Sequence, residues 1–447
     1  MSMLTTLGDT LAQYLRQLDT KLSQSNGAPP YLWDATPYSG LDDTGSLPSP
    51  EAFRLIEKIR LDLKAVEALI TPTHFKLVEL GLAPYKVAAL STAVALNVAD
   101  ALTELGGEAS LHDLATRLDT NEHKLGKIMR VLTGEFIFQE VSKDVFKHSR
   151  HSIGLAGSLG ARSFLAFITN LGAKSAIGIP NDLSRPDTKH SFTEQTAPFV
   201  REVSKDGKTF LEYFSDPNNS EMVTLANDGI VGWLNQLTRR ALLTDYPWAE
   251  LGKSTVVDVG CGPGDSGIDV MKLYPDLNWV FQDFGPVVES VKKALPSELK
   301  AREQDGRITY VEQDYFKPNA SKGDVWYLRG VLHEYSDEDV LKILSNLATT
   351  MGQTPASKMV INEVFVASPV IASASSTSPP SENIPESQSA LADMANTMTW
   401  STFSLFGGKE RSYEEYEKLL NQAGLRISRF FRFRTFTVML ECELASI

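Results

Sequence analysis

Glycines and carboxylates stand where three consecutive strand-like segments end, and a mostly parallel sheet binds its ligand at that edge. The first segment runs into VVDVGCGPGDSG, residues 256–267, in which Gly260, Gly262 and Gly264 permit a tight turn and close approach of ligand to backbone. The next two segments end at Asp283 in VFQDF and at Asp314 in VEQDYF. In such a crevice these acids would lie where a ribose and an adenine amino group bind, so the set predicts a nucleoside-like ligand.

The glycine spacing alone does not identify that ligand. Counted from Gly262, the spacing fits a dinucleotide fingerprint, whereas counted from Gly260 it does not. In either register Asp265 lies at the start of the next helix, where its negative charge opposes a pyrophosphate. The loop is therefore predicted to prefer a ligand without phosphate. Each acid taken singly is equally well explained as an ordinary loop residue, but the three features in register favour a binding site.

The elements that position these residues follow from the pattern after residue 250. Strand-like stretches alternate with helical ones, and they read STVVDVG, NWVFQD, RITYVEQD, DVWYLRGVL, KMVINEVFV and, near the end, FRTFTVMLECE. This alternation predicts an α/β fold with a doubly wound, Rossmann-like, mostly parallel sheet over residues 251–447. A Ser/Pro-rich run at 368–388 interrupts the pattern and is predicted to be a surface loop.

Residues 51–250 are predicted to be mostly helical. Within them, residues 110–149 show the order helix, turn, helix and two short strands, which is that of a winged helix. Lys124, Lys127 and Arg130 lie on its second helix. Such a triple is more often a solvated face than a DNA contact, and the net charge of −13 argues against a nucleic-acid binder.

Residues 1–50 are predicted to hold one amphipathic helix and a Pro/Gly-rich linker. The helix carries a single apolar stripe that consists of Leu4, Leu7, Leu11, Tyr14 and Leu18. This stripe needs a partner surface. The helix docks either on its own domain, which is favoured, or through the reach of the linker on a second subunit.

The composition is that of a soluble protein with more than one domain. The chain has 447 residues, of which 42% are hydrophobic and 22% charged, and no uninterrupted apolar run approaches the roughly 18 residues of a membrane span. Cys261 and Cys442 make no disulfide framework, and the N-terminus lacks the pattern of a signal peptide. We therefore expect a cytoplasmic protein with neither nucleic-acid nor membrane partners.

Taken together, these motifs resemble the S-adenosylmethionine-dependent O-methyltransferases of the plant caffeic-acid type, in their fungal natural-product branch. The resemblance covers about residues 85–445, and its most specific parts are VVDVGCGPG, QDFGPVVE, EQDYF, LRGVLHEYSDEDVLKIL and GGKERSYEEYEKLL. It implies a winged-helix dimerisation domain ahead of a Rossmann-like methyltransferase domain. It also implies a homodimer, S-adenosylmethionine as the cofactor and a small natural product as the substrate.

The resemblance further implies a set of cofactor contacts. Asp283 would hold the ribose hydroxyls, Asp314 would meet the adenine amino group, and Phe284 with Tyr315 would flank the adenine. Gly260 and Gly262 of the glycine loop would lie along the methionine part of the cofactor, and Arg329 would be a basic cofactor contact. Asp258, just before the loop, completes the set of cofactor-binding residues. No metal is implied.

Methyl transfer from a sulfonium to a hydroxyl is a direct displacement, so the enzyme must align the groups and remove a proton whose pKa is roughly 10 for a phenol. His333 follows the fourth strand in a strand-to-helix turn, where a lone histidine is usually structural. The resemblance makes it the general base, with Glu363 and Glu410 as carboxylates that orient it. Glu410 is equally explained as a charge at a helix start. Glu334 stands where the family usually has aspartate.

Two other functions remain open. Some fungal relatives use the bound sulfonium as a fixed positive charge that assists dehydration or pericyclic cyclisation, and the same motifs would serve that reaction. A non-enzymatic winged-helix regulator would leave the register of the glycine loop, the two acids and the histidine unexplained. The acceptor is not identified, because four side chains near residue 400 either line an aromatic pocket or, more in keeping with their spacing, belong to the core. These are Met394, Met398, Trp400 and Phe403.

Overall fold

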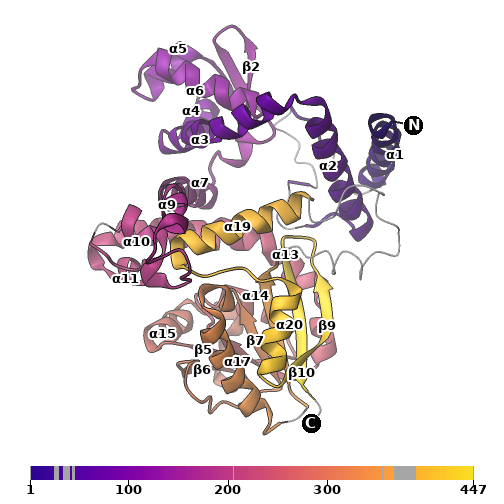
Figure 1. Ribbon diagram of the computed structural model, residues 1–447, viewed down its shortest axis with the longest axis vertical. Helices are drawn as coiled ribbons and strands as arrows, with labels where there is room; N and C mark the ends of the chain where they lie inside the picture. Colours follow the sequence, from indigo (N-terminus) through magenta and orange to yellow (C-terminus); the bar gives the residue numbers. More distant parts are fainter. Residues whose placement is uncertain are drawn as a thin grey trace. The chain divides into compact units, whose positions relative to one another are not determined.

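The computed structural model describes residues 2–24, 30–33, 41–42, 46–204, 206–354, 356–366 and 389–445. Contacts divide the chain into two compact units, which Figure 1 shows in the colours of the sequence. The first comprises Met1–Ile177 and Leu211–Leu237, and the second Gly178–Phe210 and Thr238–Ile447. The Ser/Pro-rich run at 368–388 and most of the linker that follows the first helix lie outside the described residues.

The first unit is helical around a small sheet, and it contains the predicted winged helix. Two helices, α5 (Leu111–Arg117) and α6 (Glu122–Gly134), precede the hairpin of β2 (Phe138–Ser142) and β3 (Val145–His148), and β1 (Glu108–Ser110) completes a sheet of order β1-β3-β2. Arg130 pairs with Glu140 and Asp144 of the wing, so it belongs to a salt-bridged face. The other helices of the unit are α1 (Met3–Gln24), α2 (Pro50–Ile70), α3 (Thr73–Ala95), α4 (Val98–Glu104), α7 (Leu159–Phe167), α8 (Ala173–Ile177), α11 (Phe210–Ser215) and α12 (Ser220–Gly229).

The amphipathic N-terminal helix docks within its own chain. Its striped face packs on α2, where Leu7 is buried, and Lys21 forms an ion pair with Glu51 at the start of α2. The stripe is not fully covered, because Leu4 stays largely exposed. This arrangement matches the favoured docking mode.

Helix α3 presents large apolar side chains to solvent. Leu77 and Leu80 are 66% and 72% exposed, and Phe75, Val78, Leu82 and Tyr85 are also exposed. Among the described residues, α3 is the one helix that is long and apolar enough to cross a membrane by length and composition alone. Glu79 and Lys86 interrupt it, so it contains no continuous apolar run. A contiguous exposed apolar face of this kind marks an interaction surface.

The second unit is built on a seven-stranded sheet of order β6-β5-β4-β7-β8-β10-β9. From β6 to β8 the strands are parallel, and β10 and β9 add an antiparallel edge. Because the chain runs outward in opposite directions from β4, the switch point lies between β4 and β7. The strands are β4 (Thr255–Val259), β5 (Asn278–Asp283), β6 (Ile308–Glu312), β7 (Val325–Arg329), β8 (Lys358–Val364), β9 (Leu425–Arg432) and β10 (Thr437–Leu444). The predicted doubly wound sheet is confirmed, although the sequence analysis missed β9.

Helices cover the sheet. In Figure 1, α17 (Asp337–Met351) and α20 (Tyr413–Gln422) lie side by side over it, and their buried side chains share a core with β4, β7 and β8. A separate cluster joins the aromatic rings of Trp248, Trp279 and Tyr327. The remaining helices are α9 (Ile179–Ser184), α10 (Pro198–Glu202), α13 (Asn235–Asp245), α14 (Asp265–Leu273), α15 (Gly285–Ala294), α16 (Lys300–Gln304) and α19 (Ala390–Phe406).

We predict that Gly267→Ala destabilises the second unit. A Cβ atom at Gly267 in α14 would lie 2.5 Å from Nε1 of Trp279, an indole that is buried. Such overpacking costs about 1–3 kcal/mol. Gly8→Ala is the matched control, since this helical glycine has open space around it. Alanine has the better helix propensity, so this change should stabilise the helix by less than about 1 kcal/mol. Urea unfolding midpoints measure both, and equal midpoints for the two variants would contradict the packing account.

Candidate active site

The glycine loop after β4 is closed against its neighbours. Gly260 has φ 71°, and the backbone amides of Gly260 and Cys261 both donate to Gln282 O, at 2.9 and 3.0 Å. A Cβ atom at Gly260 would lie 2.9 Å from Cγ2 of Val331, in the turn that follows β7. Glycine is therefore required here both by the left-handed backbone and by the close approach of that turn.

Asp283 ends β5 and holds this loop. Its Oδ2 accepts from the Gly262 amide at 3.0 Å, and its Oδ1 accepts from the Phe284 amide at 2.8 Å. Burial raises the pKa of Asp283, and these two amides oppose the rise. Phe284 is 55% exposed at the start of α15. A carboxylate at this strand end is thus oriented by the loop, which the sequence analysis did not anticipate.

Asp258 is the penultimate residue of β4, two residues before Gly260. It is buried and accepts from Nε1 of Trp279 at 3.1 Å. Burial raises its pKa to about 7, while the indole bond and the charge of Arg329 oppose the rise. Arg329 ends β7, and its Nη2 donates to Oγ1 of Thr238 at 3.1 Å. The ends of β4 and β7, on the two sides of the switch point, therefore bring the Arg329 guanidinium near the buried carboxyl group of Asp258.

The end of β6 supplies the other predicted contacts. Asp314 accepts from the Phe316 amide at 2.9 Å and pairs with Lys317 at 3.3 Å. Tyr315 lies against the glycine loop, since a Cβ atom at Gly260 would be 3.6 Å from its Cε1. Its hydroxyl is hydrogen-bonded to that of Tyr335, a residue that no sequence signal had singled out.

His333 lies in a short 3-10 turn, Leu332–Glu334, just after β7. Its Nδ1 is 2.8 Å from Oε2 of Glu363 on β8 and 3.6 Å from Oε1 of Glu410, which follows α19. The side chains of both glutamates are buried, and that of His333 is 20% exposed. The structure thus brings together the three residues that the sequence analysis grouped. Glu410 is not a helix-start charge, because Ser412 and Glu415 form the capping box of α20.

Burial and charge act in opposite directions on this histidine. Burial lowers the pKa of His333, but the negative charges of Glu410 and Glu363 outweigh it and raise the pKa well above the usual value. The imidazole is therefore a strong base in this site. The ligand atoms of the three residues also lie within 4.8 Å of one another, a spacing that suits a metal ion. However, Nδ1 already contacts Glu363, whose Oε1 accepts two backbone amides, so the contacts favour a hydrogen-bonded base.

A clamp that the sequence analysis missed holds the histidine turn. The guanidinium of Arg411 is fully buried and donates to Leu332 O at 2.7 Å and to Tyr335 O at 2.6 Å. The Lys409 amide donates to His333 O at 2.9 Å. A Cβ atom at Gly408 would lie 2.1 Å from the same carbonyl, so the segment needs glycine there. The segment that carries Glu410 therefore fixes the backbone on both sides of His333.

Helix α19 has both core and exposed positions. Phe403 is buried against Phe192, whereas Trp400 is 47% exposed and Met394 is also exposed. The favoured core role thus holds for Phe403 but not for Met394 or Trp400.

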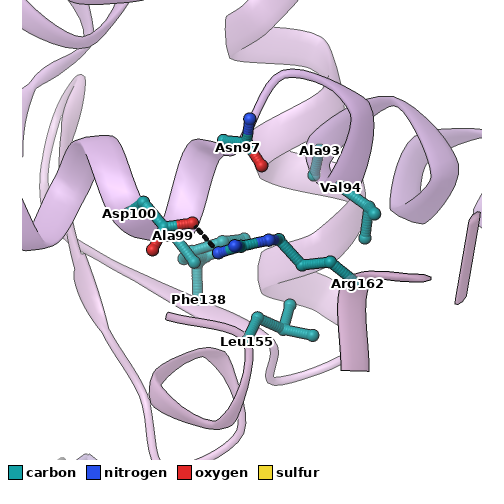
Figure 2. A pocket seen from close by; sticks show the side chains of 8 residues that line it. All are labelled: Ala93, Val94, Asn97, Ala99, Asp100, Phe138, Leu155 and Arg162. Atoms are coloured by element: carbon teal, nitrogen blue, oxygen red, sulfur yellow. Dashed lines mark hydrogen bonds and ion pairs between the residues drawn. The ribbon is translucent and has the colours of Figure 1, made fainter. Parts of the chain in front are cut away.

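A small cavity lies in the first unit, at the junction of α4 and α7 (Figure 2). Its volume is about 10 Å³, which is room for about one water molecule. The ion pair of Asp100 and Arg162 borders it beside Phe138, and the Gly157 amide also donates to Asp100. The cavity is too small for a substrate, and the ion pair beside it links α7 to α4.

Fold and site together show an α/β sheet whose switch point carries a glycine loop and strand-end acids, with a winged-helix unit ahead of it in the chain. Two family models match the chain: the O-methyltransferase domain over residues 207–426 and the O-methyltransferase dimerisation domain over residues 78–154. Curated fungal relatives include O-methyltransferase gedA of Aspergillus terreus, 26% identical over 89% of this chain and 88% of the relative. O-methyltransferase tpcA of Aspergillus fumigatus is 25% identical over 91% of this chain and 90% of the relative.

Solved structures agree on the fold. The crystal structure of OxaC has a TM-score of 0.70 at 19% identity and covers 99% of this chain and 98% of its own. The structure of the mitomycin 7-O-methyltransferase MmcR has a TM-score of 0.65 at 21% identity, and the match covers 86% of this chain and 100% of that structure. The chain belongs to the S-adenosylmethionine-dependent O-methyltransferase family, in its fungal natural-product branch. Its cofactor is S-adenosylmethionine.

We predict that Asp283→Ala weakens the binding of S-adenosylmethionine. The change removes a carboxylate that accepts from the Gly262 amide and to which the family resemblance assigns the ribose hydroxyls. The expected loss is roughly 1–3 kcal/mol, or about fivefold to hundredfold in Kd. Calorimetric titration measures it, with Asp305→Ala as the control at an exposed acid of the same unit. An unchanged Kd for Asp283→Ala would remove this residue from the cofactor site.

Proposed function

We propose that the protein transfers the methyl group of S-adenosylmethionine to a phenolic or enolic hydroxyl of a small natural product, with His333 as the general base. The observation that carries the proposal is the pairing of Nδ1 of His333 with the buried carboxylates of Glu363 and Glu410. A histidine held in this way accepts a proton at its other ring nitrogen, which suits removal of a proton from a hydroxyl.

Glu363 determines which ring nitrogen is available. Its Oε1 accepts the amides of Val331 and Leu332 at 3.0 and 2.8 Å, and its Oε2 faces Nδ1 of the imidazole. Nδ1 is therefore the protonated nitrogen, and Nε2 is left to accept the proton of the acceptor hydroxyl. When that proton arrives, the imidazolium lies beside two negative charges that stabilise it.

The charge of the cofactor adjusts this base. Without ligand, the carboxylates hold the pKa of His333 well above its usual value, so the imidazole is protonated at neutral pH. The bound cofactor supplies the methyl group and a sulfonium positive charge. A positive charge nearby lowers the pKa of the histidine, so the base becomes available when the methyl donor is in place.

We also propose that the cofactor occupies the crevice at the switch point. Asp283 would pair with the ribose, Asp314 would meet the adenine amino group, and Phe284 and Tyr315 would flank the base. Gly260, Gly262, Asp258 and Arg329 would lie along its methionine part. Two facts support this assignment: Gly260 and Tyr315 are adjacent, and the acids that gather here suit a cationic ligand.

We predict that His333→Ala separates cofactor binding from turnover. The imidazole faces the acceptor, so the variant should still bind S-adenosylmethionine, and its Kd should not rise, because a positive charge near the sulfonium has been removed. In contrast, kcat should fall by about a hundredfold to ten-thousandfold. Turnover is followed with a panel of phenolic and enolic natural products. His190→Ala, at an exposed histidine of the same unit, is the control and should retain full activity. Undiminished kcat in His333→Ala would refute the assignment of the base.

We propose that the protein is a homodimer and that the exposed face of α3 lies in the interface. The matched dimerisation model begins at residue 78, inside α3, and the apolar surface continues to Leu69 and Ile70 at the end of α2. An apolar face of this extent is stabilised when a second copy covers it.

We predict that Leu77→Glu combined with Leu80→Glu produces a monomer. Both side chains are exposed in the single chain, so the changes leave its own core intact, while two charges in a dimer interface would be desolvated. Light scattering at micromolar concentration measures the mass. Leu159→Glu, at another exposed leucine of the first unit, is the control and should remain dimeric. A wild-type monomer, or a dimer that survives both charges, would contradict the proposal.

A further inference from the structure

One contact to the histidine cluster comes from an element with no assigned role in the chemistry. Thr402 lies on α19, is buried, and donates from Oγ1 to Oε1 of Glu410 at 3.0 Å. This is the same carboxylate oxygen that lies 3.6 Å from Nδ1 of His333. Neither the motifs nor the family match singles out Thr402.

We propose that Thr402 is a positioning residue that keeps Glu410 ionised and oriented toward His333. The proposal rests on the proposed function in one respect, which is the use of His333 as the base. Thr402 acts through Glu410, to which its hydroxyl is hydrogen-bonded.

The two glutamates differ in how many donors hold them. Glu363 accepts from two backbone amides and faces Nδ1 at 2.8 Å, so three groups bind its two oxygens. Among the described residues, Oε1 of Glu410 accepts from the Thr402 hydroxyl, and its buried Oε2 has no hydrogen-bond partner. A buried carboxylate with so few donors is costly to keep ionised. In the described part of the chain, the hydroxyl of Thr402 is therefore the hydrogen-bond donor that opposes the burial of this carboxylate.

The groups around Glu410 act in both directions, and the pKa of Glu410 stays above its usual value. Burial raises the pKa of Glu410, the charge of His333 is the main opposing influence, and the Thr402 bond and Arg411 also lower it. Glu363 faces the cluster from β8 and raises that pKa, and the Tyr416 phenol faces it from α20.

Arg411 would not replace the Thr402 hydroxyl as a hydrogen-bond donor to Glu410 if that hydroxyl were removed. Its guanidinium donates to Leu332 O, to Tyr335 O and to Asp337 at 2.9 Å, and it acts on Glu410 through its charge.

Loss of the hydroxyl then changes the histidine. Without its donor, Glu410 favours the neutral form, and one of the two negative charges beside Nδ1 disappears. An opposite charge at such a distance raises a pKa by about 1–3 units, so His333 should release its proton at lower pH. Because Thr402 belongs to α19, the orientation of this helix is linked to the strength of the base.

The experiment compares Thr402→Val, which removes the hydroxyl at nearly constant volume, with Thr402→Ser, which keeps it. The pH titration of His333 is followed by NMR of histidine-labelled protein saturated with S-adenosylhomocysteine, and His333→Asn assigns the resonance. We expect the midpoint to fall by about one unit or more in Thr402→Val and in Glu410→Gln. In Thr402→Ser it should stay within a few tenths of a unit of wild type.

A wild-type midpoint in Thr402→Val overturns the proposal, as do equal shifts in the valine and serine variants, which would indicate packing alone. If Thr402→Val does not fold, Thr402→Ala removes the same hydroxyl without adding an atom and is judged by the same criterion. The titration involves no methyl transfer. Its failure would therefore leave the proposed function standing, and loss of the proposed function would leave the titration interpretable.

Discussion

The structure of the site depends on keeping two buried carboxylates next to one imidazole. Each burial is unfavourable on its own, and the surrounding structure offsets it with specific donors. Glu363 receives two amides of the turn that follows β7, and Glu410 receives the hydroxyl of Thr402. His333 completes the cluster, and Arg411 clamps the carbonyls on both sides of it. The position of the histidine is thus the common result of β7, β8, α19 and the loop before α20.

The sheet order explains why this cluster lies beside the glycine loop. The switch point separates β4 from β7, so the glycine loop after β4 and the histidine turn after β7 are neighbours. Their contact is direct, because Gly260 leaves no room for a side chain against Val331. Under the proposed function, a cationic cofactor bound at the loop would act on the histidine through its charge, so that binding of the methyl donor would also adjust the base.

The sequence predicted much of this, and the omissions have physical causes. Apolar alternation revealed the buried strands, but half of the residues of the Arg-rich edge strand β9 (LRISRFFR) are exposed, and its alternation breaks after Ser428. The glycines and the strand-end acids were visible because the backbone demands them locally. Glu363 and Glu410 came only from family resemblance, because nothing near them in sequence shows that they meet. Arg411, Thr402 and Tyr335 act through contacts between distant segments, which no local pattern encodes.

The most direct test of the account is to follow the methyl group itself. Wild-type protein is incubated with S-adenosylmethionine that carries a deuterated methyl group and with candidate natural products, and the mixture is analysed by mass spectrometry. The account predicts that the product carries the labelled methyl on oxygen and that one S-adenosylhomocysteine forms for each product molecule. An isomerised or dehydrated product with the cofactor unconsumed would contradict it, because the sulfonium would then act only as a fixed charge.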